Sequence, residues 1–243
     1  MEHKTLQFFQ RPLQPGCLFS FLFFLMAFFL PQEAVAQESR KSAVQQIKEA
    51  EDGDVIDLEG KTYVLDYVEL SGKKTVTLKN GTIIRRDDQK LREMLFGIGD
   101  GFKLILDEVN LKGGKLSKGA PIVYVKWGGT LEMNGGAITE ARVDDAVVSC
   151  VEVSGGGTFI MNGTWIDGEK GLTEGEIKVE EGGTLVMNGG SAKWVMNDGT
   201  TKIGGDASIR EYYGSMKPLE IFAPLTEGRI LSLIHISEPT RLQ

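Results

Sequence analysis

Residues 128–135 read GGTLEMNG, and the same pattern returns at 156–163 as GGTFIMNG and at 182–189 as GGTLVMNG. The first residues of these strings lie 28 and 26 residues apart. A period of this length is typical of solenoid proteins, in which each repeat forms one coil that packs on the next. Weaker copies at 75–79 and 103–107 extend the pattern toward the N-terminus, so the sequence predicts five coils.

Apolar residues recur at matching positions of the aligned copies. One column contains Val76, Leu104, Leu131, Phe159 and Leu185, and the next contains Leu78, Leu106, Met133, Met161 and Met187. Two further columns contain Ile83, Leu111, Ile138, Ile166 and Ala192, and Val68, Phe96, Val123, Val151 and Ile177. Alternation at a period of two predicts strands with one buried face. Each coil is therefore expected to supply three short strands, with a glycine-rich first turn and an Asn-Gly second turn.

These features resemble the right-handed parallel β-helix proteins of pectate-lyase-like architecture, and more closely the GGTLxMNGG repeats of bacterial surface and secreted proteins. The resemblance covers about residues 52–205. It implies an all-β fold with three-strand coils of 26–28 residues, whose parallel strands pair with those of the next coil. It does not imply one function, because this architecture carries lyases, hydrolases, adhesins and spacers.

The segment before the repeats predicts an amphipathic helix. Val44, Ile47 and Ala50 would share one helical face, and Gly53 would end the helix. We expect this segment, 37–53, to cap the open end of the first coil. The following residues, AEDGDVIDLEGKTY at 50–63, resemble the first coil of secreted polysaccharide-degrading β-helix enzymes.

Both ends of the chain predict segments outside the β-helix at 54–230. Lys4 and Arg11 precede an apolar run of 14 residues at 17–30, and Ala34-Val35-Ala36 matches a cleavage site, so 1–36 predicts a signal peptide cut after Ala36. The protein is then secreted or at the cell surface, without a stable membrane span. The tail 231–243 contains LSLIHISEPTR, which resembles a translated sequencing adaptor, and predicts that the natural protein continues beyond Ile230.

Composition excludes several kinds of site. The two histidines, His3 and His235, lie in these terminal segments, so no histidine-based triad or histidine-ligated metal is expected in the repeats. The net charge of −7, without a basic stripe, argues against nucleic acid as a partner. No cofactor is indicated. Cys150 is the single cysteine between the two ends, and we expect it to be a small buried residue.

The outward side of the first strand of each coil is the candidate binding surface, because β-helix enzymes commonly place their substrate groove there. Its central column is expected to contain Glu69, Gly97, Tyr124, Glu152, Lys178 and, as a further candidate, Lys202. Tyr124 and nearby Trp127 could stack on a sugar ring, although packing at the edge of the core is the simpler interpretation. Glu152 and Lys178 could contact a ligand, and a mutual ion pair explains them equally simply.

Two other sets of residues suggest simpler roles. Asn134, Asn162 and Asn188 occupy the same turn of three coils and predict a ladder of hydrogen-bonded side chains. Carboxylates gather in the third turns at Asp144, Asp145, Asp167 and Glu169. Adjacent turns of this kind could bind calcium, but their spacing matches no known calcium loop, and solvated loop charge is the alternative.

Two functions remain open from the sequence. The first is a non-catalytic scaffold or adhesin-like module with a polysaccharide or surface glycan as its partner. The second is the N-terminal part of a polysaccharide lyase or glycoside hydrolase whose catalytic coils are missing. No complete acid and base pair is visible, and this favours the scaffold.

Overall fold

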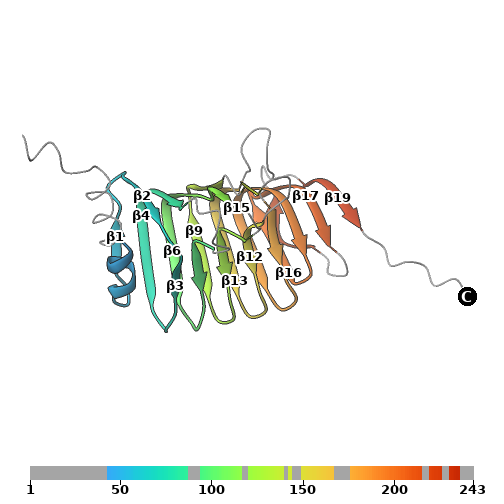
Figure 1. Ribbon diagram of the computed structural model, residues 1–243. Coiled ribbons are helices and arrows are strands. Elements are labelled where there is room, and N and C mark those ends of the chain that lie inside the picture. Colours follow the sequence, from blue (N-terminus) through green and yellow to red (C-terminus); the bar gives the residue numbers. More distant parts are fainter. Residues whose placement is uncertain are drawn as a thin grey trace, which may run out of the picture. The chain divides into compact units, whose positions relative to one another are not determined.

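The computed structural model describes residues 43–86, 94–116, 120–139, 142–143, 149–166, 176–214, 219–225 and 230–235 (Figure 1). Within these ranges the chain forms a helix at 43–49 and strands that all pair in parallel. Figure 1 shows the strands stacked in chain order from β1 toward β19. The expected all-β parallel β-helix is therefore confirmed.

The strands of the early and middle coils are β1 (Val55–Asp57), β2 (Thr62–Leu65), β3 (Val68–Leu70), β4 (Thr75–Arg85), β5 (Phe96–Ile98), β6 (Lys103–Lys112), β7 (Lys115–Leu116), β8 (Val123–Val125), β9 (Thr130–Asn134), β10 (Ala137–Thr139) and β11 (Arg142–Val143). The later strands are β12 (Ser149–Val153), β13 (Thr158–Ile166), β14 (Glu176–Val179), β15 (Thr184–Asn197), β16 (Thr200–Gly205), β17 (Ser208–Gly214), β18 (Leu219–Leu225) and β19 (Ile230–His235). Several long strands, such as β4 and β15, contain two or three sides of a coil in one continuous element.

The predicted apolar columns are the interior of the coils. Val76 pairs with Leu104, Leu104 with Leu131, Leu131 with Phe159, and Phe159 with Leu185. All five side chains are fully buried. Successive coils lie about 4.8 Å apart, so each apolar side chain packs on its counterparts above and below. The hydrophobic effect, summed over these columns, selects the register.

The two predicted glycine turns have the backbone that glycine favours. In the first turn, Gly128 and Gly156 have φ angles of 75° and 79°. In the second turn, Gly135 and Gly163 have φ angles of 87° and 99°. The earlier coils place Asn80 (φ 56°) and Glu108 (φ 53°) at this second-turn position.

The helix at 43–49 adjoins the first coil. It places Ala43, Ile47 and the following Ala50 in the buried cluster, while Val44 packs against that cluster and stays partly exposed. Lys74 Nζ donates a hydrogen bond of 2.6 Å to the carbonyl oxygen of Ala50, so the next coil satisfies a carbonyl group at the end of the helix. Gly53, expected to end the helix, has a φ angle of 88°.

The coil length changes after Ala192, which the repeat pattern did not indicate. Ile177 pairs with Val195, only 18 residues later, and Val195 pairs with Tyr212, only 17 residues later. The shortening falls on the third turn, since β15 continues directly from the third side of one coil into the first side of the next. The coils continue through β18 and β19 with this shorter connection.

This change makes the placement of Lys202 wrong. Lys202 lies on β16 and pairs with Val186, which belongs to the second strand of its coil. Met196 takes the expected place, because it pairs with Lys178 in the outward column. The physical reason is that a coil without its long third turn reaches the first-strand position about ten residues earlier than a period of 26–28 predicts.

Several predictions concern residues beyond this description. The predicted signal peptide at 1–36 and the acidic candidates Asp144, Asp145, Asp167 and Glu169 lie outside the described residues. Of the predicted adaptor tail, 231–235 belong to β19, which pairs with β17. No helix in the described part of the chain is long and apolar enough to cross a membrane.

Candidate functional site

The outward residues of the first strands form one continuous column, which we call the first-strand face. In order along the coils it contains Glu69, Gly97, Tyr124, Glu152, Lys178, Met196 and Tyr213. The residues on either side of each outward position are mostly buried, as in Val123-Tyr124-Val125. Their packing therefore fixes the direction of each outward side chain.

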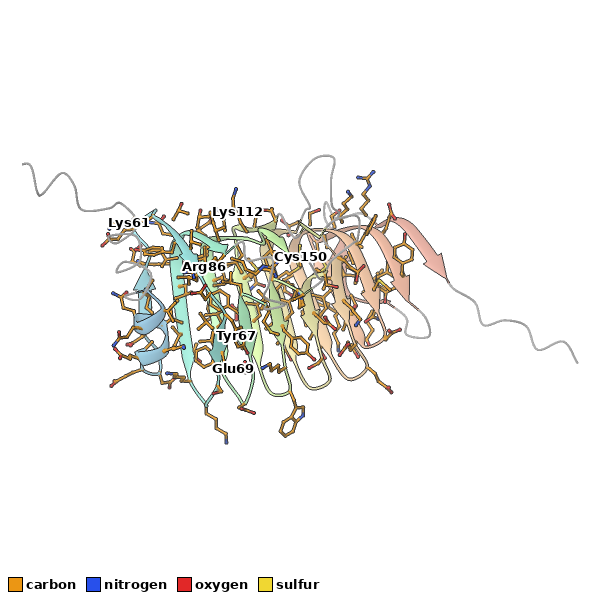
Figure 2. All side chains as sticks on the ribbon, in the orientation of Figure 1. Lys61, Tyr67, Glu69, Arg86, Lys112 and Cys150 are labelled. Atoms are coloured by element: carbon orange, nitrogen blue, oxygen red, sulfur yellow. The ribbon has the colours of Figure 1, made fainter. Side chains whose placement is uncertain are left out.

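An ion pair crosses this face above Gly97. Lys126 Nζ lies 2.6 Å from each carboxylate oxygen of Glu69 and 3.4 Å from the hydroxyl of Tyr67. A Cβ atom at Gly97 would lie 2.7 Å from both Glu69 Oε2 and the Tyr67 hydroxyl. Glycine at this position thus leaves the room that the ion pair occupies, and Figure 2 labels Tyr67 and Glu69 on this part of the stack.

A second charged network lies further along the face. Lys178 Nζ is 2.9 Å from Glu152 Oε1 and 2.9 Å from Glu180 Oε1. Hydrogen bonds from Glu180 and Glu152 raise the pKa of Lys178, and the hydrogen bond from Lys178 lowers the pKa of Glu180. These shifts favour the charged form of each group. A general acid and base need shifts toward the working pH, so this network is suited to structure and polar contact rather than to proton transfer.

Glu176 is the carboxylate on this face whose environment differs. Burial raises its pKa, and Ser149 Oγ donates a hydrogen bond of 3.1 Å to Glu176 Oε1. In the next coil Glu176 pairs with Trp194, which in turn pairs with Glu211. Sequence reasoning missed this second outward column. The residues immediately before the predicted buried Ile177 and before Val195 were the signal that could have revealed it.

Trp127 corrects the expectation that it packs at the edge of the core. It lies in the first turn after β8 and is 75% exposed. Its indole ring occupies the space that a Cβ atom at Gly156, in the next coil, would need. The ring is therefore held against a glycine turn while most of its surface meets solvent. Tyr124, two coils from Glu69 in the column, is half-buried.

The three asparagines of the second turn are linked to one another. Asn162 Nδ2 donates to Asn134 Oδ1 at 2.8 Å, and Asn188 Nδ2 donates to Asn162 Oδ1 at 2.7 Å. Each donor thus meets the acceptor of the preceding coil. These contacts give the asparagines a structural role in holding three coils in register.

Neither a metal site nor a reactive thiol is evident in the described ranges. Among those residues, no group of three His, Cys, Asp or Glu side chains is placed to hold a metal ion. Cys150 is fully buried, with Sγ 4.0 Å from the carbonyl oxygen of Ile138, and Figure 2 labels it within the stack. Its burial makes it part of the core rather than a nucleophile.

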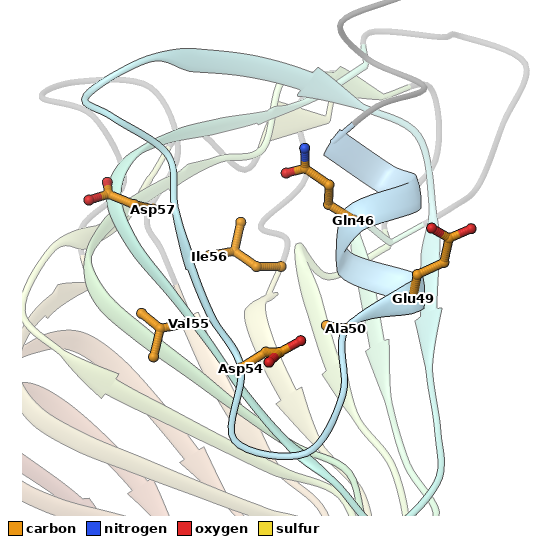
Figure 3. Close-up of a pocket in the computed structure, with 7 residues that line it drawn as sticks. All are labelled: Gln46, Glu49, Ala50, Asp54, Val55, Ile56 and Asp57. Atoms are coloured by element: carbon orange, nitrogen blue, oxygen red, sulfur yellow. The ribbon is translucent and has the colours of Figure 1, made fainter.

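A shallow hollow of about 460 Å³ lies between the helix and β1 (Figure 3). It is lined by Gln46, Glu49, Ala50, Asp54, Val55, Ile56 and Asp57. Two of its carboxylates hold the local backbone: Asp54 Oδ2 accepts from Glu51 N at 2.7 Å, and Asp57 Oδ1 accepts from Glu59 N at 2.8 Å. The backbone hydrogen bond from Glu59 lowers the pKa of Asp57. These groups stabilise turns and give the hollow no proton-transfer pair.

The first-strand face therefore combines an exposed indole ring with charged side chains that are already paired. Such a surface can stack on a flat apolar group and exchange hydrogen bonds around it. No family model, curated protein or solved structure matches the chain, so the functional argument depends on this geometry.

Proposed function

We propose that the protein is a secreted or surface-exposed β-helix module that binds glycans without cleaving them. The observation that carries this proposal is Trp127, which is 75% exposed yet held against the glycine turn at Gly156. An exposed tryptophan exposes much apolar surface to water. Placing a flat sugar ring against it removes that surface from water while the hydroxyl groups of the sugar stay solvated.

The neighbouring groups suit a polar, ring-shaped ligand. Lys126 precedes Trp127 in the chain and forms an ion pair with Glu69, and Tyr124 lies in the outward column beside them. Carboxylate, ammonium and phenol groups supply both donors and acceptors for sugar hydroxyls. Because the strands beneath them are fixed by buried side chains, little conformational entropy would be lost on binding.

The charges on the face support a binding role over a catalytic one. The shifts at Lys178 and Glu180 hold both groups in their charged forms. The alternative function is the N-terminal part of a polysaccharide lyase or glycoside hydrolase, and Glu176 is the observation that favours it. Its pKa is raised by burial, as a general acid requires.

Retention on immobilised polysaccharides tests the proposal. The protein, Trp127→Ala and Trp127→Phe should be compared on a panel of polysaccharides, with the exposed charge variant Lys61→Ala as control. We expect a fall in affinity of about tenfold or more for Trp127→Ala, because loss of an aromatic hot spot costs about 2 kcal/mol. Trp127→Phe should keep part of the affinity, and Lys61→Ala should bind like the unmodified protein.

Two outcomes would overturn this function. Equal retention of the protein and Trp127→Ala would place the glycan elsewhere. Shortening of the polysaccharide chains during incubation, lost in Glu176→Gln, would favour the enzyme instead. Secretion has its own test: the N-terminal sequence of protein recovered from outside an expressing cell should begin at Gln37.

A further inference from the structure

A second aromatic residue lies on the first-strand face between two carboxylates. Trp194 pairs with Glu176 of the preceding coil and with Glu211 of the following coil. Each step is one coil, about 4.8 Å. Trp194 precedes the fully buried Val195 and is partly exposed, as are Glu176 and Glu211. The three residues therefore form a short row, carboxylate, indole, carboxylate, across three coils.

The indole ring of Trp194 already attracts a cation. Lys193 Nζ lies 5.6 Å from the centroid of the Trp194 ring, within the range of a cation–π contact. The ring therefore faces a region where positive charge is favourable. A ligand cation at this ring would compete with Lys193.

The charges around Trp194 are predominantly negative. Glu152 and Glu180 share Lys178, while Glu176 and Glu211 flank the indole and accept hydrogen bonds from the hydroxyl groups of Ser149 and Tyr213. Burial raises the pKa of Glu176, so the structure stabilises its charge poorly. A positive group placed beside this carboxylate would supply the missing stabilisation. The net charge of −7 adds long-range attraction for cations.

We propose that Trp194, Glu176 and Glu211 bind the ammonium group of an amino sugar, so that the preferred glycan carries free amino groups. This inference rests on the proposed glycan-binding function and names the class of its ligand. Trp127 and Trp194 lie three coils apart by the pairing of Val123, Val151, Ile177 and Val195, which is about 14 Å along the stack. A linear oligosaccharide can reach both tryptophans, and two contacts on one chain increase the affinity.

The test compares two oligosaccharides that differ only in charge. The probes are a glucosamine hexamer and its N-acetylated counterpart, titrated into the protein by calorimetry at about pH 6, below the pKa of an amino group. We expect the charged hexamer to bind about tenfold more tightly, since an ammonium group gains both a cation–π contact and a carboxylate partner. Added salt should reduce this preference.

Variants with opposite expected effects make the test specific. Glu176→Gln and Glu211→Gln should each reduce the preference for the charged hexamer severalfold. Lys193→Gln should raise the affinity for that hexamer, because it removes the internal competitor for the ring. All three substitutions change partly exposed side chains and should leave the thermal unfolding transition near that of the unmodified protein.

The outcomes separate this inference from the proposed function. If both hexamers bind equally and Trp127→Ala weakens both, glycan binding stands and the ammonium site is overturned. A preference for the charged hexamer that survives both Glu→Gln variants also overturns it. Binding of oligolysine without binding of the glucosamine hexamer overturns it as well, and would identify a basic peptide as the partner.

Discussion

Glu108 occupies a backbone position that the later coils give to glycine. Its φ angle is 53°, and the equivalent Gly135 and Gly163 have φ angles of 87° and 99°. A residue with a Cβ atom in this left-handed region costs roughly 1–2 kcal/mol. The earlier coil accepts this cost, and the GGTLxMNGG coils avoid it.

Exchanging the residues at this position should change stability in opposite directions. Glu108→Gly should raise the free energy of unfolding by about 0.5–1 kcal/mol, after allowing for the greater freedom of glycine in the unfolded chain. Gly163→Ala should lower it by about 1 kcal/mol. A Cβ at Gly163 meets no atom within 4 Å, so that loss would come from the backbone alone. Urea unfolding measures both, and shifts of the same sign would contradict this account of the turn.

Glu176 should make stability depend on pH in an unusual direction. Its pKa is raised from 4.5 by burial, so the folded protein holds this proton more tightly than the unfolded chain does. Stability from this group is present at low pH and is lost as the pH rises through its ordinary value and up to the raised one. Glu176→Gln should therefore unfold with a higher free energy than the unmodified protein at pH 7 and with little difference at about pH 3.

Glu180→Gln is the matched control, because the hydrogen bond from Lys178 lowers the pKa of Glu180. Stability from Glu180 is present above its ordinary value and lost as the pH falls through the lowered one. Glu180→Gln should thus be less stable than the unmodified protein at pH 7. Denaturant unfolding at several pH values should show the two variants diverging with opposite signs, and parallel behaviour would contradict the assignments.

At the scale of elements, the asparagine ladder ties β9, β13 and β15 together. Asn162 both donates to Asn134 and accepts from Asn188, so Asn162→Ala removes two hydrogen bonds and should cost about 1–2 kcal/mol. Asn188→Ala removes one and should cost about half as much. The double variant should be no less stable than Asn162→Ala, because the same bond is lost in both. Fully additive losses in thermal unfolding would show that the ladder contributes nothing as a unit.

The two ends of the stack differ in how well they cover apolar groups. The helix at 43–49 buries Ala43 and Ile47 at one end, whereas Ile221 and Phe222 on β18 are 58% and 52% exposed. Ile221 pairs with the fully buried Ile203, so it continues an interior column. An exposed continuation of the core beside a strand edge favours association with another chain.

We therefore expect self-association through β18. Light scattering after size-exclusion chromatography should show a mass that rises with protein concentration, and Ile221→Ser with Phe222→Ser should reduce that rise. The double substitution should change the unfolding free energy little, because both side chains are already exposed. A monomer at every concentration, resistant to protease through residue 230, would contradict the expectation.

At the scale of the whole molecule, the sequence predicted what the repeats encode directly. The buried columns follow from alternation within GGTLEMNG, GGTFIMNG and GGTLVMNG, and the pairing from Val76 to Leu185 agrees with them. The coils after Ala192 could not be predicted in the same way. Their third turn is short and no such string marks their start, so Lys202 was placed on the wrong strand.

The candidate site was less predictable than the fold. The sequence identified the face and the pair of Glu152 and Lys178, which lie 2.9 Å apart. It did not reveal that Trp127 is exposed, because exposure depends on the glycine turn of the next coil at Gly156. It also missed Trp194 between Glu176 and Glu211, since that row exists only where the coil shortens.

The most direct test of glycan binding on the first-strand face is the indole N–H spectrum of the protein during titration with a retained oligosaccharide. The chain has three tryptophans, Trp127, Trp165 and Trp194, and substitution assigns each signal. The account predicts that the Trp127 signal shifts with saturation and that the sugar chain stays intact. A ligand that binds while the Trp127 signal stays unchanged, or a chain that is cleaved during the titration, would contradict it.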